Sequence, residues 1–380
     1  MTAASLAIKC HFRKLKDPRR RHGREHRFLD IIVIGICAVI AGANTWRDIA
    51  CFGKRRQPWL KRFLALPNGI PSHDTFERVF QRLDPKQFQT CLRGWLLALA
   101  GVVEIRHVSI DGKTMRGTQD APRGLGPLHL VSAWASEHHL TLGEVAVDAK
   151  SNEITAIPQL LDTLDLHGAL VTIDAMGCQK AIAEKIVARG GDYALVVKGN
   201  QDHLLSDIQH VVGQVLENGK QGEDYHSYEH VGRGHGRDEK RGCVVVANLK
   251  NLEHQGEWAK LRVVGMVYRE RTIGAKSSSE VSYFIGSKKA GARTYAHGLR
   301  NHWSIENNLH WQLDVSFDED HNRTAHRNAT SNLASLRKTA LTLLKRHPGD
   351  QSIRTKRLQT AWDTEFLEEI LIGLANPEKP

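Results

Sequence analysis

The sequence lacks a hydrophobic run long enough to cross a membrane. Its longest, residues 31–43, has 13 residues, whereas a transmembrane helix needs about 20. Asp30 and Arg47 bracket this run, and no signal-peptide cleavage pattern follows it. We therefore expect a buried core helix here and no membrane partner.

Cysteine is sparse and scattered. The six cysteines include no C-x-x-C pair, so nothing supports a zinc-knuckle or thioredoxin-type site. Several stand among apolar residues, where cysteine behaves as a small hydrophobic side chain. This usage suits a reducing compartment, and we expect a cytoplasmic protein.

Acidic residues are outnumbered. The 380 residues contain 53 Lys and Arg against 42 Asp and Glu, a formal net charge of +11. A surplus of this size favours a polyanionic partner, either nucleic acid or an anionic membrane surface. The length allows two or three domains, and 41% hydrophobic with 25% charged residues is typical of globular proteins.

Residues 1–100 have a helical pattern. In the segment 71–84, Ser72 can cap a helix whose apolar residues recur at helical spacing. Its other side presents Arg78 and Arg82, which would suit a helix that enters a DNA groove. An ordinary amphipathic helix is the simpler interpretation of this segment alone.

From residue 101 to 199 the period changes to that of strands. We expect three antiparallel strands followed by helix, strand, helix and strand, which is the layout of an RNase H-like core. The expected strands are 107–111, 128–135, 140–147, 169–173 and 193–197, and the expected helices are 153–164 and 179–188. Residues 112–117 are expected to turn the chain after the first strand.

The remainder divides into three parts. Residues 200–292 are predicted to be a mostly β insertion, with a polar stretch at 223–241 and strands at 243–247, 261–269 and 281–286. Residues 293–345 are predicted to hold the last core helices, 293–311 and 332–345, and residues 346–380 form a tail. The expected fold class is therefore α/β: an RNase H-like mixed sheet flanked by helices, with an N-terminal helical domain and a β insertion.

Two aspartates occupy comparable positions on expected strands. Asp111 ends one apolar strand and Asp174 ends another. In open α/β sheets, ligands bind at the carboxyl ends of strands. If the two strands are neighbours, both carboxylates converge at one edge of the sheet.

A third acid belongs to a helix. On a regular helix over residues 295–313, Glu306 lies in the middle of the arc that contains Leu299, Leu309 and Leu313. A carboxylate that faces a core must be neutralised, hydrogen-bonded or bound to a metal. We therefore expect Glu306 to be functional, with a buried structural ion pair as the alternative.

The residue types favour a hard metal ion. His302 and His310 flank Glu306 at i−4 and i+4, a pattern that also suits zinc or iron, but oxygen ligands from two aspartates suit Mg²⁺ or Mn²⁺. Asp314 or Asp320 is an alternative third ligand. Three carboxylates holding two ions suit in-line phosphoryl transfer, because the ions activate the attacking oxygen and stabilise the leaving one.

Basic and aromatic residues near these acids are expected to contact DNA, mostly at phosphates. Trp303 also falls on the apolar arc of its helix, so a core position is the favoured alternative for it. The expected contacts are Lys113, Arg116, Lys198, Arg233, Arg237, Lys240, Arg241, His302, Trp303 and Trp311.

Motifs along residues 15–345 resemble insertion-sequence transposases of the H-repeat-associated type, a bacterial DDE family. The matching stretches include GIPSHDTFERVF, HVSIDGKTMRG, VTIDAMGCQKAIA, DYALVVKGNQ, HGRDEKR and the highly specific LRNHWSIENNLHWQLDVSFDED. Related DDE enzymes often show a Tyr-Arg-Glu-Lys signature around the glutamate. Here His302 lies four residues before Glu306 and Leu313 seven after it, which departs from that signature.

The resemblance implies an RNase H-like catalytic domain, an associated N-terminal helical domain and a Mg²⁺-dependent mechanism with Asp111, Asp174 and Glu306 as the catalytic acids. It implies a transposase that binds the terminal inverted repeats of a mobile element, acts on target DNA and works as a homodimer at the nucleoid of a bacterial cell. Two alternatives remain open: an inactive DNA-binding relic that represses the element, and a nuclease that hydrolyses DNA without joining it.

Overall fold

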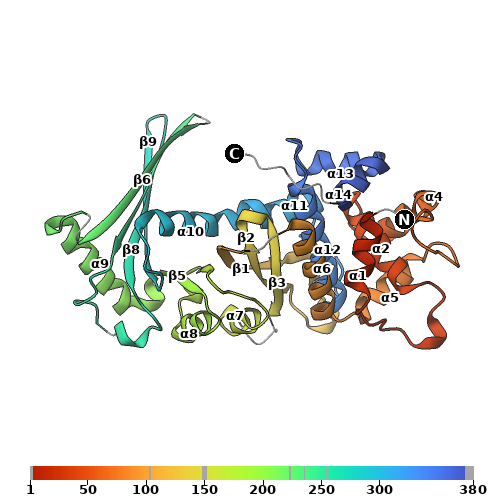
Figure 1. Cartoon of the computed structure of the whole chain (residues 1–380), viewed down its shortest axis with the longest axis horizontal. Helices are drawn as coiled ribbons and strands as arrows, with labels where there is room; N and C mark the ends of the chain where they lie inside the picture. The colour runs from red at the N-terminus through yellow and green to blue at the C-terminus, as the bar shows by residue number, and fades with distance from the viewer. Residues whose placement is uncertain are drawn as a thin grey trace. The chain divides into compact units, whose positions relative to one another are not determined.

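The computed structural model describes residues 3–101, 104–147, 152–221, 224–234, 236–253 and 255–372. The chain forms two compact units that alternate along the sequence (Figure 1). Unit 1 comprises Met1–Val103, Gly112–Lys150 and Glu306–Pro380. Unit 2 comprises Glu104–Asp111 and Ser151–Ile305. The functional division of the chain into domains stays a prediction.

The N-terminal part of unit 1 is helical, as the sequence predicts. The apolar run forms a helix that is buried from Asp30 to Ile40, and burial of each large aliphatic side chain contributes about 1.5–3 kcal/mol. Ser72 caps the next predicted helix by accepting a hydrogen bond from the Thr75 N–H. The helices are α1 (Ala3–Phe12), α2 (Phe28–Ile40), α3 (Trp46–Arg55), α4 (Gln57–Leu60), α5 (His73–Arg82) and α6 (Pro85–Ala100). None of the described helices has the length and apolarity that a bilayer crossing requires.

Helix α12 (Arg327–Arg346) is the centre of unit 1. It packs against α2, α5 and α6, although more than two hundred residues separate it from them in the chain. The buried Asn332 Nδ2 donates to the carbonyl oxygens of Phe80 (2.8 Å) and Leu83 (3.0 Å) at the end of α5. The C-terminal part thus completes the core of the N-terminal helices. Its other helices are α11 (Trp311–Phe317), α13 (Ile353–Trp362) and α14 (Thr364–Ile372).

Strand β1 (His107–Met115) belongs to both units, since the boundary falls between Asp111 and Gly112. The sequence predicted a turn from residue 112, and this prediction is wrong: the strand continues to Met115. In unit 1 the antiparallel strands β2 (Leu128–Ala135) and β3 (Leu140–Val147) follow. Met115 packs there with residues of β2 and α12.

Unit 2 contains the parallel part of the sheet. Strand β1 pairs in parallel with β4 (Leu170–Ile173), and β4 with β5 (Asp192–Val197). The whole sheet has the order β3-β2-β1-β4-β5-β9-β8-β7-β6. This mixed α/β sheet confirms the predicted RNase H-like fold class. The helices of unit 2 are α7 (Glu153–Leu161), α8 (Lys180–Ala188), α9 (Asp202–Asn218) and α10 (Ala292–Ile305).

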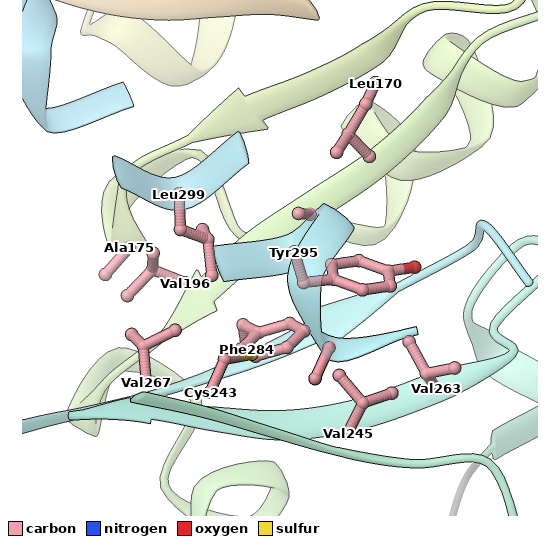
Figure 2. Packing of buried hydrophobic residues seen from close by; sticks show 12 residues of the cluster. Leu170, Ala175, Val196, Cys243, Val245, Val263, Val267, Phe284, Tyr295 and Leu299 are labelled. Carbon is pink, nitrogen blue, oxygen red and sulfur yellow. The ribbon is translucent and has the colours of Figure 1, made fainter. Parts of the chain in front are cut away.

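Four long antiparallel strands form the predicted β insertion: β6 (Tyr225–Gly234), β7 (Arg237–Val246), β8 (Val263–Ile273) and β9 (Lys276–Gly286). Their basal halves bury apolar side chains against α10, where Tyr295 and Leu299 meet Cys243 and Phe284 (Figure 2). Strand β6 and the outer half of β7 were not predicted. Both lie in the polar stretch, where β6 is mostly exposed and the outer half of β7 is mostly half-buried, and no alternation of apolar and polar residues marks them.

Single-turn 3₁₀ segments connect several of these elements. They are Arg21–Gly23, Arg116–Thr118, Ala121–Arg123, Ser136–His138, Ala175–Gly177, Gly199–Gln201 and Gln255–Glu257.

Candidate active site

Asp111 and Asp174 come from adjacent parallel strands of unit 2. The last paired residues of β1 and β4 are Ile110 and Ile173, and the aspartates are the next residue on each. Asp174 keeps an extended backbone, with φ −66° and ψ 179°. Partners in a parallel register point to the same face of a sheet, so both carboxylates project from one face.

That face is the one covered by α10. Ser109 and Thr172 precede the two aspartates by two residues and therefore share their face. The Ser109 hydroxyl donates to the carbonyl oxygen of Asn301 on α10 (3.4 Å). The Thr172 hydroxyl hydrogen-bonds Nε2 of His107 (3.0 Å), which also belongs to this face of β1.

The two aspartates differ in local structure. Asp111 lies within β1 and not at its end, which corrects the sequence-based expectation, because β1 continues after its pairing with β4 stops. Asp174 caps the following turn: its Oδ1 accepts from the N–H groups of Met176 (3.1 Å) and Gly177 (3.3 Å). The backbone of its strand positions Asp111, whereas hydrogen bonds to the carboxylate itself hold Asp174.

The pKa of Asp174 is raised from its ordinary value. Burial is the main cause and the nearby carboxylate of Glu153 adds to it, whereas the two backbone hydrogen bonds and Lys198 act in the opposite direction. Because its surroundings disfavour the ionised form of Asp174, a cation bound beside this carboxylate would favour its ionisation.

Glu306 lies in unit 1, at the start of a π-helical turn that spans Glu306–His310. Its side chain is 69% exposed, so the expectation that it faces the core is wrong. The regular helix α10 ends at Ile305, and the wider π turn changes which direction the next residue faces. Leu309 and Leu313 remain buried as predicted.

His310 orients this glutamate. Its Nδ1 lies 3.2 Å from Glu306 Oε2, and its side chain is 5% exposed. The imidazole is therefore fixed by packing while the carboxylate reaches solvent. The sequence placed His310 on the same face as Glu306 but did not indicate this hydrogen bond.

His302 lies in unit 2 and is 4% exposed. This corrects the expectation of a DNA contact, because the ring is enclosed by the core under α10. Burial lowers its pKa to about 4, so the ring is neutral at neutral pH. Trp303, the next residue, is 50% exposed; the alternative of a core position for it is wrong, and its face is available for stacking.

Lys113 is surrounded by acids of unit 1. Its Nζ lies 2.6 Å from Asp314 Oδ1, 3.4 Å from Asp320 Oδ1 and 3.8 Å from Oε2 of the buried Glu319. Burial acts to lower the pKa of Lys113, but Glu319, Asp314 and Asp320 together raise it. Lys113 is therefore an internal counter-ion, which argues against its expected role as a DNA contact. Asp314 and Asp320, the alternative third ligands, already have Lys113 as a cationic partner.

The other expected DNA contacts reach solvent. Arg116 is 84% exposed in unit 1. In unit 2, Lys198 is exposed directly after β5, and Arg237 and Arg241 on β7 are partly exposed. Their roles toward DNA stay predictions.

These features match a known class of enzyme. Residues 103–343 match the family model "Transposase DDE domain", and residues 9–96 match "DDE_Tnp_1-associated". The chain belongs to the DDE transposase family.

Within that family the chain is similar to H repeat-associated proteins of Escherichia coli. It is 37% identical to "H repeat-associated putative transposase YhhI" of strain K12, over 96% of this chain and 97% of the relative. It is 38% identical to "Putative transposase YncI" of O157:H7, over 94% of this chain and 92% of the relative. The similarity to H-repeat-associated transposases that the motifs predicted is confirmed.

Among solved structures, the chain is similar to the piggyBac transposase synaptic complex with hairpin DNA. The sequence identity is 11% and the TM-score 0.42, with all of this chain and 83% of that chain covered. A similarity this low supports no further conclusion.

Proposed function

We propose that this protein is a DNA transposase that binds the ends of a mobile element and catalyses metal-dependent cleavage and strand transfer. The observation that supports this best is the pair Asp111 and Asp174, at equivalent positions on adjacent parallel strands of a transposase-family fold. We propose Glu306 as the third acid. The chain passes from unit 2 to unit 1 directly after Asp111, and again directly before Glu306.

The available side chains suit two Mg²⁺ or Mn²⁺ ions. Asp111, Asp174 and Glu306 offer oxygen ligands, which hard divalent cations prefer. The raised pKa of Asp174 fits a carboxylate whose charge a cation would compensate. His310 adds an imidazole that holds the Glu306 carboxylate in one orientation, as partners of metal ligands commonly do.

When bound, the ions would supply the Lewis acidity that lowers the pKa of an attacking water or 3′-hydroxyl and stabilises the leaving 3′-oxygen. The protein's own task is to position DNA. Exposed cations such as Arg116 and Lys198 would neutralise phosphates. Trp303 and Trp311, 50% and 51% exposed, would stack on an unpaired base.

A strand-transfer assay with Mg²⁺ and element-end DNA tests the proposal. We expect Asp111→Asn, Asp174→Asn and Glu306→Gln each to lower cleavage and joining by about 10³-fold or more, because each removes an oxygen ligand that stabilises charge in the transition state. Asp202→Asn and Glu217→Gln, exposed acids of α9, are the matched controls. Wild-type activity in any of the three site variants would remove that residue from the mechanism.

The products separate this proposal from its alternatives. Joined molecules are expected from a transposase, whereas nicked or cut molecules alone would indicate a nuclease. Among the relatives, "Inactive transposase YbfQ" of Escherichia coli K12 matches 18% of this chain at 42% identity, so an inactive relic needs its own test. Titration of DNA-bound protein with Mn²⁺ supplies it: absence of metal binding would favour the relic.

Strand transfer also needs two element ends, and we therefore propose a homodimer in the DNA complex. Light scattering of the protein alone and with element-end DNA tests this. A single copy of the chain per synaptic complex would contradict it.

A further inference from the structure

The outer halves of β6–β9 have two faces of different charge. The register places alternate residues of all four strands on the face that packs on α10; we call this the helix-side face. Figure 2 shows its apolar base, where Cys243, Val267 and Phe284 meet α10. Beyond that base, the charged residues of the helix-side face are Arg237, Glu239, Arg241, Arg269, Arg271, Lys276 and Glu280.

The opposite face of the same strands has, among its described residues, two cations, Arg233 and Lys240, and three acids, Glu229, Asp238 and Glu270. Arg233 Nε and Nη2 donate to the two carboxylate oxygens of Asp238 (2.5 and 3.0 Å). Lys240 Nζ lies 3.0 Å from Glu229 Oε2, which also accepts a hydrogen bond from the Tyr268 hydroxyl (2.6 Å). On this face Arg233 and Lys240 are engaged by acids and leave no surplus of positive charge. In contrast to the sequence-based expectation, we therefore do not propose these two residues as DNA contacts.

Helix α10 adds a basic stripe to the helix-side face. Arg293, His297 and Arg300 follow one another at i, i+4 and i+7 and are all exposed, while α10 contains no acid. The stripe contacts β6 directly: the Arg293 guanidinium lies 6.0 Å from the ring centroid of Tyr228, and His297 lies 5.6 Å from it, ring to ring. The helix and the strands therefore present one continuous surface.

Like charges converge on this surface. Burial is the first cause of the lowered pKa of Arg241, and Arg300 and Arg269 lower it further, whereas Glu239, which pairs with both Arg241 (2.6 Å) and Arg269 (2.5 Å), acts in the opposite direction. Burial also lowers the pKa of His297, together with Arg293, Arg300 and His230. In the described residues of β6–β9 and α10, seven lysines and arginines stand on this surface against two carboxylates, Glu239 and Glu280. Mutual repulsion of this kind is relieved by a bound polyanion.

We propose that the helix-side face of β6–β9, together with the Arg293–His297–Arg300 stripe of α10, binds the sugar-phosphate backbone of duplex DNA. This rests on the proposed function and specifies where unit 2 holds its substrate. A two-stranded or wider β ribbon with an adjacent helix is a surface that duplex DNA can follow. The outer parts of the strands extend past α10 (Figure 1), so the ribbon lengthens the surface that the helix begins. Arg300 stands six residues before Glu306 in the chain, which places the stripe on the segment that leads to the proposed third acid.

The two faces supply a matched pair of variants. Arg237→Gln/Arg300→Gln removes two positive charges from the helix-side face, and Arg233→Gln/Lys240→Gln removes two from the opposite face. Fluorescence anisotropy would measure the affinity of full-length protein for a random-sequence duplex and for an element-end duplex over a series of salt concentrations. Thermal unfolding of each variant would establish that both remain folded.

For the helix-side variant we expect at least about tenfold weaker binding to both duplexes, and a salt slope reduced by about two, close to 0.9 per lost phosphate contact. The opposite-face variant should bind within about twofold of wild type. Equal losses in both variants, no loss in the helix-side variant, or a loss confined to the element-end duplex would each overturn the proposal.

The outcome also separates this proposal from the function on which it rests. Normal strand transfer by wild type with no difference between the two variants would overturn the assigned surface alone. A wild-type protein that binds neither duplex would overturn both.

Discussion

His107 and His302 are both buried in unit 2, and they lie close enough for the charge of His302 to affect the pKa of His107. His107 lies on the same face of β1 as Asp111, and its Nε2 meets the Thr172 hydroxyl. Burial is the main cause that lowers the pKa of each histidine to about 4, and the positive form of His302 would lower that of His107 further. Both rings are therefore neutral in the folded protein near neutral pH.

This pair predicts a loss of stability in mild acid. Because the unfolded chain binds protons near pH 6.5 and the folded chain only near pH 4, the free energy of unfolding should fall as the pH decreases through that window. The expected loss at pH 5 is about 2 kcal/mol per histidine. Urea unfolding at pH 7 and pH 5 measures it. His302→Leu should show a smaller difference between the two pH values; an unchanged difference would contradict the assignment.

Replacement of Lys113, two residues after Asp111 in the chain, is expected to lower the stability of the folded protein. Lys113→Ala removes the cation shared by Asp314, Asp320 and the buried Glu319, which among the described residues keeps only Arg337 at 3.8 Å as an ion-pair partner. Loss of one partner of a buried ion pair costs about 3–5 kcal/mol, so thermal unfolding should occur at a markedly lower temperature. Arg116→Ala, which alters an 84% exposed side chain, should change stability by less than about 1 kcal/mol. Similar stabilities of the two variants would show that Lys113 is not an essential counter-ion.

At the residue scale, the sequence predicted the position of Asp174 at the end of its strand but not that of Asp111, which lies within its strand. Asp174 follows its strand as expected, since an apolar strand before an Asp and a turn is a local pattern. The pairing of Lys113 with Asp314 and Asp320 was not predictable, because the partners are about two hundred residues apart in the chain. The burial of His302 was missed because a polar side chain on an apolar helix face is compatible with either location.

At the scale of the element, the π turn Glu306–His310 determines how exposed the Glu306 side chain is. A uniform 100° per residue places Glu306 among buried leucines, but the structure inserts a wider turn there. The regular part of the helix and the burial of Leu299, Leu309 and Leu313 were predicted correctly, whereas Trp303 on the same predicted arc is exposed. The π turn was not, because its signal is a single extra residue in an otherwise regular pattern.

Deletion of Asn307 should convert this turn to regular α-helix and rotate Glu306 with respect to His310. We expect loss of strand transfer with retained DNA binding, because only the orientation of the carboxylate changes. Asn307→Ala keeps the chain length and should retain most of the activity. Strand-transfer and anisotropy assays measure the two properties, and an active deletion variant would show that the π turn does not orient the acid.

At the scale of the whole molecule, unit 1 is assembled from three separated segments of the chain. The sequence predicted the helical N-terminal part and the two later helical segments, but not that α12 packs against α2, α5 and α6. Amphipathic periodicity shows that a helix has a buried face and does not identify the partner of that face.

The packing of α12 predicts that the N-terminal helices are required for folding of unit 1. A chain that begins at Glu104 leaves the apolar surface of α12 without these partners, and we expect low solubility and no cooperative thermal transition from unit 1. Co-expression with residues 1–103 as a separate chain should restore the transition in part. A cooperative, monomeric 104–380 chain would contradict this dependence.

The late position of α12 also matters during translation. Helices α2, α5 and α6 leave the ribosome more than two hundred residues before the helix that packs on them is made, so their isoleucine- and phenylalanine-rich surfaces stay accessible to chaperones for most of synthesis. A gene copy with a frameshift between codons 101 and 327 would therefore produce a chain whose intact first hundred residues have no α12 to fold against.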